Sequence, residues 1–360
     1  MKKLIAISVV FALVAGVAFA VDLGGTVISG VNVIQADSGG GNVTAEALLQ
    51  RVRLEGSGEV ADGQFGGWLR FEGGTEGYAW WKPIDQLKIK IGKFGDGFWG
   101  QDGNSRWSFY QHATDTNVSM GAGHAWGAGD LAADGLSLGA AFAGGYGSGG
   151  LMVEITPVEM VAINIGLPFS YAGGKIEDVF KGTFAQVALN LSFGDIAFSY
   201  QGNATNIQSS YVWGYFGLKA IENLQIDFGL GTNFNNEVND RLNIGIAVKY
   251  APGTWGIKFR SLFAIPFYGD QKFGMLFDVL PYFVINETFR VYASGGVAIS
   301  NIKDLGGGAS WHVNPYLEIG EEWGAKFLVG IKVWQVGRLA GALSIAKVQF
   351  AVPIALVVSF

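Results

Sequence analysis

The sequence predicts an all-β protein, a transmembrane antiparallel up-and-down β-barrel, from three observations. The 360 residues are 49% hydrophobic and only 15% charged, whereas soluble domains carry roughly 25% charged residues. After residue 20 there is no run of about 20 apolar residues, which a transmembrane helix would need. Apolar residues recur instead at every second position, the period of a strand. Because only helices and closed barrels span a bilayer, this combination favours a barrel.

The first 20 residues have the pattern of a secretory signal peptide. Lys2 and Lys3 precede an apolar stretch over 5–17, and Ala18-Phe19-Ala20 supplies small residues at a cleavage site. We expect residues 1–20 to be cleaved and residues 21–360 to form a single barrel domain, with no plug domain before the first strand. An uncleaved membrane anchor is the alternative. The chain contains no cysteine, so the exported protein would have no disulfide.

The two-residue alternation separates an apolar face from a mixed polar face. Between residues 87 and 94, Leu87, Ile89 and Ile91 alternate with two lysines and a glycine. The same pattern occurs in 48–56, 187–193, 241–250 and 325–334. We expect the apolar face to contact lipid and the polar face to line a lumen, as in outer-membrane barrels. A soluble sandwich or β-helix would also alternate. Its polar face is usually dense in charge, however, whereas many positions here are Gly, Ala or Ser.

The links between the predicted strands give the strand count. From residue 156 onward, short turns alternate with longer polar loops, which is the arrangement of short periplasmic turns and longer extracellular loops. Consistent strand directions require one weak, glycine-rich strand near 117–126. The count is about 20, with 16 or 18 left open because the hairpins before residue 145 are weak. The predicted strands lie near 24–36, 45–56, 63–72, 77–83, 87–94, 117–126, 135–144, 150–157, 160–167, 180–193, 196–202, 210–220, 224–232, 240–250, 255–264, 272–284, 289–299, 310–319, 325–335 and 346–360.

Charge is distributed unevenly along the chain, whose formal net charge is −6. Acidic residues lie mostly in turns and loops, and basic residues lie mostly on the polar faces of predicted strands. Since rings of Lys and Arg attract anions, one hypothesis is an anion-preferring lumen. The alternative is that Glu55 and Glu72 neutralise the basic cluster and leave the pore weakly selective. The predicted pore-lining residues are Arg51, Arg53, Arg70, Lys88, Lys90, Lys258, Arg260 and Lys332.

The longest predicted loop, residues 95–118, is polar but rich in aromatic residues. Loops longer than about 12–15 residues are often functional. We predict that it folds into the lumen and narrows it, with Trp99, Arg106, Trp107 and Tyr110 at the constriction. An extracellular flap anchored by the same aromatic residues is the alternative.

Residues for catalysis are not apparent. There is no cysteine nucleophile, and the three histidines, His112, His124 and His312, lack the spacing of metal ligands. The acidic residues of the long loop match no calcium-loop motif. We therefore expect no enzyme activity, no cofactor, no metal and no nucleic-acid partner.

The last strand carries two expectations of its own. Residues 346–360 should pair with the first strand, 24–36, because an open sheet edge is not tolerated in lipid. Pro353 has no backbone N–H to donate to a neighbouring strand, so we expect a local irregularity in the ladder beside it.

With its signal peptide, its alternation and its C-terminal segment 350–360, the chain resembles bacterial outer-membrane porins throughout. The hairpin at 80–94 is similar to hairpins of phosphate- and oligosaccharide-selective porins. The resemblance implies a passive channel for small hydrophilic solutes, located in the outer membrane with lipid and lipopolysaccharide or an equivalent around it. It also implies that Leu356, Val358 and Phe360 form a signal for the barrel-assembly machinery, and it allows a homotrimer. A surface adhesin or structural barrel is the alternative function.

Overall fold

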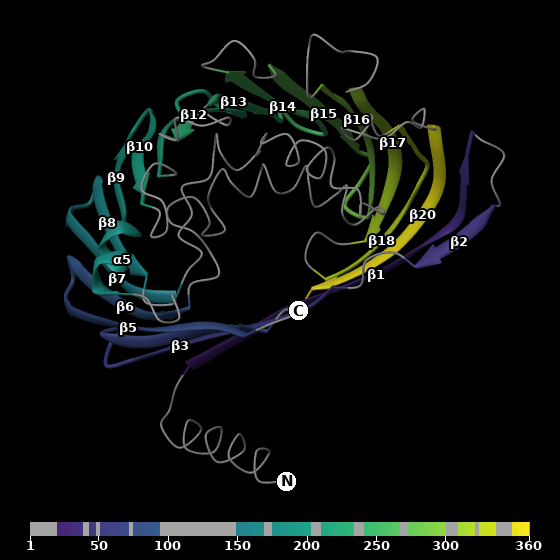
Figure 1. The fold of residues 1–360 in the computed structure, drawn as a ribbon. Coiled ribbons are helices and arrows are strands. Elements are labelled where there is room, and N and C mark those ends of the chain that lie inside the picture. Colours follow the sequence, from purple (N-terminus) through teal and green to yellow (C-terminus); the bar gives the residue numbers. More distant parts are fainter. Residues whose placement is uncertain are drawn as a thin grey trace.

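The computed structural model describes residues 20–38, 43–47, 51–71, 75–93, 149–168, 175–202, 210–233, 241–266, 273–299, 309–320, 324–335 and 348–359. These residues form a closed barrel in which sequential strands pair antiparallel (Figure 1). No helix in this part of the chain has the length and apolar character needed to cross a membrane. The predicted fold class, an all-β up-and-down barrel, is confirmed.

Twenty strands and one short helix, α5 (Ile176–Lys181), make up the described chain. The helix overlaps the beginning of the strand predicted at 180–193, which starts instead at Phe184. In chain order the strands are β1 (Ala20–Asp37), β2 (Thr44–Ala47), β3 (Arg51–Val60), β4 (Phe65–Phe71), β5 (Thr75–Ile84), β6 (Leu87–Lys93), β7 (Gly149–Val158), β8 (Val161–Pro168), β9 (Phe184–Leu191), β10 (Gly194–Gln201), β11 (Tyr211–Leu218), β12 (Leu224–Asn233), β13 (Arg241–Tyr250), β14 (Trp255–Pro266), β15 (Gly274–Val284), β16 (Phe289–Ile299), β17 (Ala309–Gly320), β18 (Ala325–Gly330), β19 (Lys332–Gln335) and β20 (Val348–Ser359).

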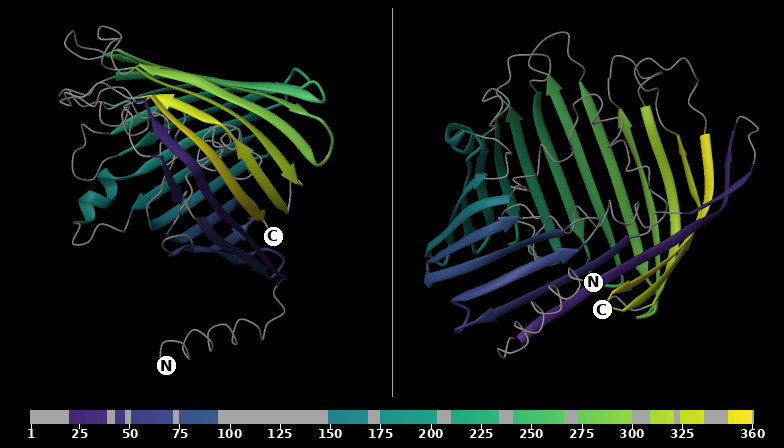
Figure 2. Two further views of the ribbon diagram at one scale, coloured as in Figure 1. Left: turned by 90° about the vertical axis from the view of Figure 1, so that its right-hand side faces the viewer. Right: turned by 60° about the horizontal axis from the view of Figure 1, so that its bottom comes forward.

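These strands occupy eighteen positions around the described ring. Two positions each hold two short strands in line: β2 and β3 both pair with β1 at successive residues, and β18 and β19 both lie between β17 and β20. Twenty strands less these two gives eighteen, an even number within the predicted range. Figure 2 shows the strands running obliquely around the wall, as barrel closure requires.

The barrel closes where the first strand meets the last, as predicted. β1 pairs with β20 from Thr26 opposite Ser359 to Asp37 opposite Gln349. The irregularity expected at Pro353 is confirmed on both sides of β20. Toward β1 the register shifts just after the pair Asn32–Pro353. Toward the other neighbour, pairing with β18 ends at Ile354 and resumes with β19 at Ala351, because proline has no N–H for the ladder.

The strand map needs one correction between β6 and β7. These two strands pair directly along their whole length, from Leu87 opposite Ile155 to Lys93 opposite Gly149. The wall therefore has no place between them for the strands predicted at 117–126 and 135–144. Both segments lie outside the described residues. Without these two strands the count stays even and the directions of all other strands stay the same, so strand direction cannot distinguish the two maps.

The links that the structure describes in full are short turns, and they all lie at one rim. They span 61–64, 85–86, 159–160, 192–193, 219–223, 251–254 and 285–288. The backbone conformation fits this role: Ala61, Asp62 and Asn223 have positive φ angles, and Asn and Asp tolerate that region best among non-glycine residues. The prediction that the short turns lie together on one side of the barrel is therefore confirmed for these links.

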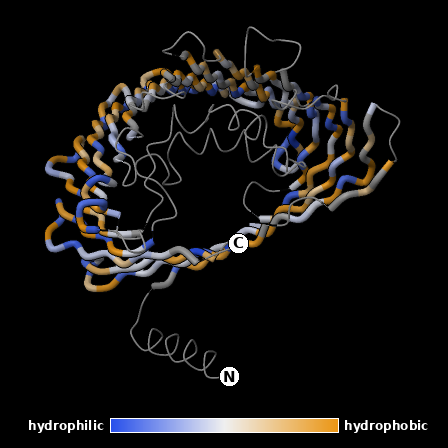
Figure 3. Tube along the Cα trace, in the orientation of Figure 1, coloured by the Kyte–Doolittle hydropathy of each residue, from blue (hydrophilic) through white to orange (hydrophobic). Residues whose placement is uncertain are grey.

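The two faces of the wall differ in burial and polarity. On β9 and β10, Gln186 and Ser199 are paired across the ladder and buried, whereas Val187 and Phe198, the next pair, are 45% and 65% exposed. In a closed single-layer sheet the inward side chains converge and the outward ones spread apart, so the buried face is the inner one. Figure 3 shows hydropathy alternating along the strands. The predicted separation of an apolar outer face from a polar inner face is confirmed.

Candidate functional site: the inner wall of the barrel

Basic and aromatic side chains alternate on the inner face of β3 to β7, a region named here the basic-aromatic stripe. It consists of Arg53, Glu55, Trp68, Arg70, Tyr78, Trp80, Lys88, Lys90 and Glu154. The ladder places all of them on one face, with Glu55 opposite Arg70, Trp68 opposite Tyr78, Trp80 opposite Lys90 and Lys88 opposite Glu154. In the ladder, Arg51 is paired with Ile28 on β1 and Glu76 with Arg70 on β4.

Each aromatic ring of the stripe has a cation over it. The Arg70 guanidinium lies 4.9 Å from the centroid of Trp68, the Lys88 ammonium 4.5 Å from Trp80 and the Lys90 ammonium 5.1 Å from Tyr78. Cation–π contacts contribute roughly 0.5–1 kcal/mol when exposed and about 2 kcal/mol when desolvated. They hold long, flexible basic side chains flat against the wall, so the cations line the lumen without filling it.

Two carboxylates share the cations of the stripe. Glu55 accepts from Arg70 at 2.6 Å and lies 3.4 Å from Arg53, and Glu154 forms an ion pair with Lys90. Glu55 therefore neutralises part of the positive charge of the basic cluster, as the alternative to an anion-preferring lumen proposed. Glu72 lies outside the described residues. With four basic and two acidic side chains, the stripe keeps a net positive charge among its described side chains.

Two inner-wall aromatic rings lie over a glycine of the neighbouring strand. Trp80 is paired with Gly66, and Tyr282 is paired with Gly256. A Cβ atom on Gly66 would lie 2.1 Å from the Trp80 indole, and one on Gly256 would lie 2.4 Å from the Tyr282 ring. Glycine is required at both positions because the ring occupies the space of a side chain. Part of the high glycine content is thereby explained.

A tyrosine ladder follows from Tyr282 across the inner face of β15, β16 and β17. The rings of Tyr282 and Tyr292 are 5.7 Å apart, and those of Tyr292 and Tyr316 are stacked at 4.7 Å. Tyr316 packs with Leu280, Leu328 and Ala355. This part of the inner wall is aromatic and apolar, unlike the basic-aromatic stripe.

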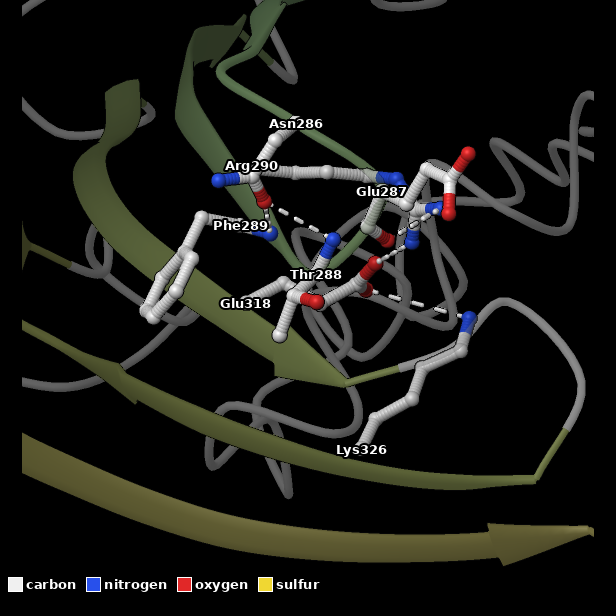
Figure 4. Close-up of polar contacts among 7 residues, drawn as sticks. All are labelled: Asn286, Glu287, Thr288, Phe289, Arg290, Glu318 and Lys326. Atoms are coloured by element: carbon white, nitrogen blue, oxygen red, sulfur yellow. Dashed lines mark hydrogen bonds and ion pairs between the residues drawn. The ribbon is translucent and has the colours of Figure 1, made fainter.

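A cluster of ion-paired side chains lies at the short-turn rim of β16, β17 and β18 (Figure 4). Arg290 donates to Glu318 at 2.8 Å, and the Lys326 ammonium lies 3.9 Å from the other oxygen of Glu318. The adjoining turn is fixed by Asn286, whose side-chain oxygen accepts from the backbone N–H groups of Thr288 and Phe289. The carboxylate ties three neighbouring strands together at the rim.

Uncharged hydrogen bonds cross the inner face of β8 to β10. Asn164 donates to Gln186 at 3.2 Å, and Gln186 donates to Ser199 at 2.8 Å.

Charged side chains occur on the strands that follow. On β11 and β12, the Tyr215 hydroxyl and the Gln225 amide both donate to Asp227, each at 2.7 Å. At the short-turn rim Lys219 pairs with Asp195. On β13 and β14, Lys249 lies directly opposite Lys258.

No group of three or more His, Asp or Glu side chains is placed to hold a metal ion within the described ranges. What the inner wall presents is a polar surface with charged, amide and aromatic groups arranged along a closed ring. Such a surface suits contact with water and dissolved solutes.

Comparison with solved structures identifies the architecture, although no protein-family model and no curated protein matches the sequence. The anion-selective porin from Comamonas acidovorans is 12% identical with a TM-score of 0.53, covering 95% of this chain and 100% of that chain. OccK7 (OpdD) of Pseudomonas aeruginosa is 9% identical with a TM-score of 0.55, covering 96% and 99%. OpdK of Pseudomonas aeruginosa with vanillate is 9% identical with a TM-score of 0.53, covering 95% and 99%.

The fold is that of a porin-type barrel. At these identities the likeness concerns the fold alone.

In this porin-type barrel the predicted pore-lining residues can be placed one by one. Arg53, Arg70, Lys88 and Lys90 lie in the basic-aromatic stripe. Lys258 and Lys332 lie on the inner face of β14 and β19, both buried. Arg51 and Arg260 occupy inner-face register positions. The structure therefore brings four of the eight together in the stripe, with Arg51 on the same strand as Arg53, and places Lys258 and Arg260 on β14 and Lys332 on β19.

The remaining predicted residues divide into two groups. Leu356 and Val358 lie on the outer face of β20, with Leu356 48% exposed. Trp99, Arg106, Trp107 and Tyr110 of the predicted constriction, and Phe360 of the predicted assembly signal, lie outside the described residues.

Several inner-wall residues were missed by sequence reasoning. These are Trp68, Tyr78 and Trp80 of the stripe, the carboxylates Glu154 and Glu318, and the group around His312 and Asn314. Their placement on the inner face could have been predicted, because each alternates along its strand with apolar outer-face residues. Their mutual contacts depend on cross-strand register, which the sequence did not supply.

Proposed function

We propose that the protein is an outer-membrane channel through which small hydrophilic solutes diffuse passively. The observation that carries the proposal is the division of a closed wall into an apolar outer face and a polar, charged inner face. An apolar outer surface of this kind is suited to lipid. Barrels of 16–18 strands enclose an aqueous channel rather than a packed core. The proposal includes no enzymatic step and no cofactor.

The proposed location follows from the same features. A cleaved signal peptide at residues 1–20 would export the chain, and the outer face would contact outer-membrane lipid and lipopolysaccharide or an equivalent. The outward placement of Leu356 and Val358 on β20 fits a C-terminal assembly signal that ends at Phe360. The proposal includes a homotrimer, on the resemblance to porins.

The channel would prefer anions to a modest degree. The basic-aromatic stripe supplies Arg53, Arg70, Lys88 and Lys90, and Lys258 and Lys332 add to the inner wall elsewhere. The preference is modest because Glu55, Glu154 and Glu318 pair with several of the cations. The Comamonas porin, which shares this fold, is anion-selective.

The long segment at 95–118 would narrow the channel. The preceding strand β6 ends at Lys93 and the following strand β7 begins at Gly149, both at the rim opposite the short turns. Within the chain between these two points, Trp99, Arg106, Trp107 and Tyr110 would form the constriction. Deletion of residues 97–112 should raise the single-channel conductance. Unchanged conductance would favour an extracellular flap.

Two measurements test the function. In liposome swelling with sugars of graded size, we expect swelling with small sugars and a size cut-off. Absence of swelling with a correctly folded barrel would favour the adhesin or structural alternative. In a planar bilayer with a potassium chloride gradient, the reversal potential should indicate chloride preference. A preference for potassium would reject the anion hypothesis and leave the channel hypothesis intact.

A further inference from the structure

A group of polar side chains on the inner face of β17, β19 and β20 contains buried atoms without hydrogen-bond partners. The group, named here the β19 polar cluster, consists of Lys332, Asn314 and Gln349. Lys332 is 2% exposed and Asn314 is 0% exposed. Four atoms of the cluster have no hydrogen-bond partner within the part of the chain that the structure describes: the Lys332 ammonium nitrogen, the oxygen and the nitrogen of the Asn314 amide, and the Gln349 oxygen.

The ladder places the three residues side by side. Val313 pairs with Val333, so Asn314 on β17 adjoins the position of Lys332 on β19. Lys332 pairs with Ala351, and Trp334 pairs with Gln349, so Gln349 lies one inward step along β20. Cβ atoms at directly opposed positions, such as Asn314 and Lys332, are about 4.5–5.5 Å apart, and those of diagonal neighbours, such as Lys332 and Gln349, are about 7–8 Å apart. The cluster is therefore one local group on the inner face of the wall.

Among the described residues, the surroundings of the cluster provide no acceptor for the ammonium group. Lys332 lies 5.0 Å from the ring centroid of Trp334, an interaction that leaves its N–H donors without oxygen partners. Glu318, further along β17, is held by Arg290 and Lys326. The neighbouring Ser294 and His312 are hydrogen-bonded to each other at 2.7 Å. Buried polar groups are normally hydrogen-bonded, and a buried cation is normally paired.

These unsatisfied atoms define the chemistry of a missing partner. The Lys332 ammonium and the Asn314 N–H groups are donors for an anionic oxygen, and charge-assisted bonds of this kind are the stronger ones. The Asn314 and Gln349 oxygens are acceptors for a hydroxyl group. The Trp334 ring forms an apolar side to the site. A small molecule that carries an oxyanion would pair with the donors, and each hydroxyl group that it carries would donate to one of the two acceptors.

We propose that the β19 polar cluster is a binding subsite for the oxyanion group, a carboxylate or a phosphate, of a small hydroxylated solute. The Lys332 ammonium and the Asn314 N–H groups bind the oxyanion, and the adjacent hydroxyl donates its one hydrogen to either the Asn314 or the Gln349 oxygen. The subsite rests on the proposed function, because the channel supplies the solute. It makes the channel more than a uniform pore, since one class of anion is retained briefly at a defined place.

Saturation-transfer NMR on the full-length barrel in detergent micelles tests the subsite without requiring conduction. The probes are glycolate, acetate and inorganic phosphate. We expect saturable binding of glycolate, weaker binding of acetate, which lacks the hydroxyl, and competition by phosphate. If phosphate displaces glycolate, the oxyanion is recognised by its charge and oxygen geometry. If it does not, the subsite is specific for carboxylate. Both results support oxyanion binding.

Three variants locate the site. Lys332→Met removes the ammonium and keeps the apolar stem against Trp334, so glycolate affinity should fall at least tenfold. Asn314→Ala leaves the net charge unchanged and should lower the affinity severalfold. Lys82→Met, near the short-turn end of β5, removes the same charge elsewhere and should alter affinity less than twofold. Circular dichroism verifies that each barrel is folded.

Wild-type affinity retained in both Lys332→Met and Asn314→Ala would overturn the proposal, as would no binding of any probe by the folded wild-type barrel. The outcome is separable from that of the channel proposal. Swelling without probe binding would reject only the subsite, and probe binding without swelling would reject only the channel.

Discussion

Two glycines on the inner wall are required because an aromatic side chain on the neighbouring strand occupies the space that a Cβ atom would need. Gly66 lies under Trp80, and Gly256 lies under Tyr282, each pair being directly opposed in the ladder. Glycine in a strand ordinarily weakens it, but here the ring covers the exposed backbone and takes the place of the missing side chain. The substitution that would normally stabilise a strand should therefore destabilise it at these positions.

Replacing Gly66 by alanine should lower the free energy of unfolding by about 1–3 kcal/mol, the usual cost of overpacking. The new Cβ would also lie 2.7 Å from the backbone oxygen of Gly58, which cannot move as a side chain can. Urea unfolding of the barrel in lipid vesicles measures the change. Gly67→Ala is the matched control, because its Cβ would make only an ordinary contact at 3.5 Å. Equal destabilisation by both variants would contradict the packing explanation.

At the scale of the strand, the basic-aromatic stripe depends on one carboxylate. Glu55 on β3 holds both Arg53 on its own strand and Arg70 on β4. Replacing Glu55 by glutamine would keep the shape of the stripe and remove its principal negative charge. A unit charge about 4 Å from a permeating ion contributes about 1 kcal/mol in water, so the chloride-to-potassium permeability ratio should rise by up to about fivefold.

The reversal potential in a salt gradient measures this ratio. Glu59→Gln is the control, because Glu59 is exposed at the short-turn end of the same strand and its charge is screened by solvent. A ratio that falls or stays unchanged in Glu55→Gln would show that the stripe does not face the ion path.

The elements differ in how far the sequence could predict them. The irregularity at Pro353 was predictable because the missing N–H is a local property of one residue. The direct pairing of β6 with β7 was not, because adjacency across residues 94–148 is a non-local property that local alternation does not encode. For the same reason Lys88 and Lys90 could be placed on the inner face, but their rings, Trp80 and Tyr78, could not be identified.

At the scale of the whole molecule, closure depends on the β1–β20 register. The chain has no cysteine, so a double variant of Thr26→Cys and Ser359→Cys would carry the only thiols. The two positions are directly opposed, within the Cα separation that a disulfide needs. Mild oxidation should link the two ends and change the mobility of the unfolded chain on a non-reducing gel.

The control pairs Thr26→Cys with Ala355→Cys, four residues along the same strand as Ser359. At about 3.4 Å per residue, those thiols would be roughly 14 Å out of register, and no link should form within one barrel. Efficient linking of the control pair in place of the opposed pair would contradict the closing register.

The pairing of Thr26 with Ser359 also has a kinetic consequence. It joins residues separated by nearly the entire length of the chain, whereas almost every other strand pair joins neighbours in sequence. Contacts between distant residues incur a larger loop-closure entropy and form late. The edge of β1 that pairs with β20 therefore stays unpaired until the twelve residues of β20 have been synthesised. A chain interrupted before β20 would be left with that edge exposed for aggregation, however completely its other strands had formed.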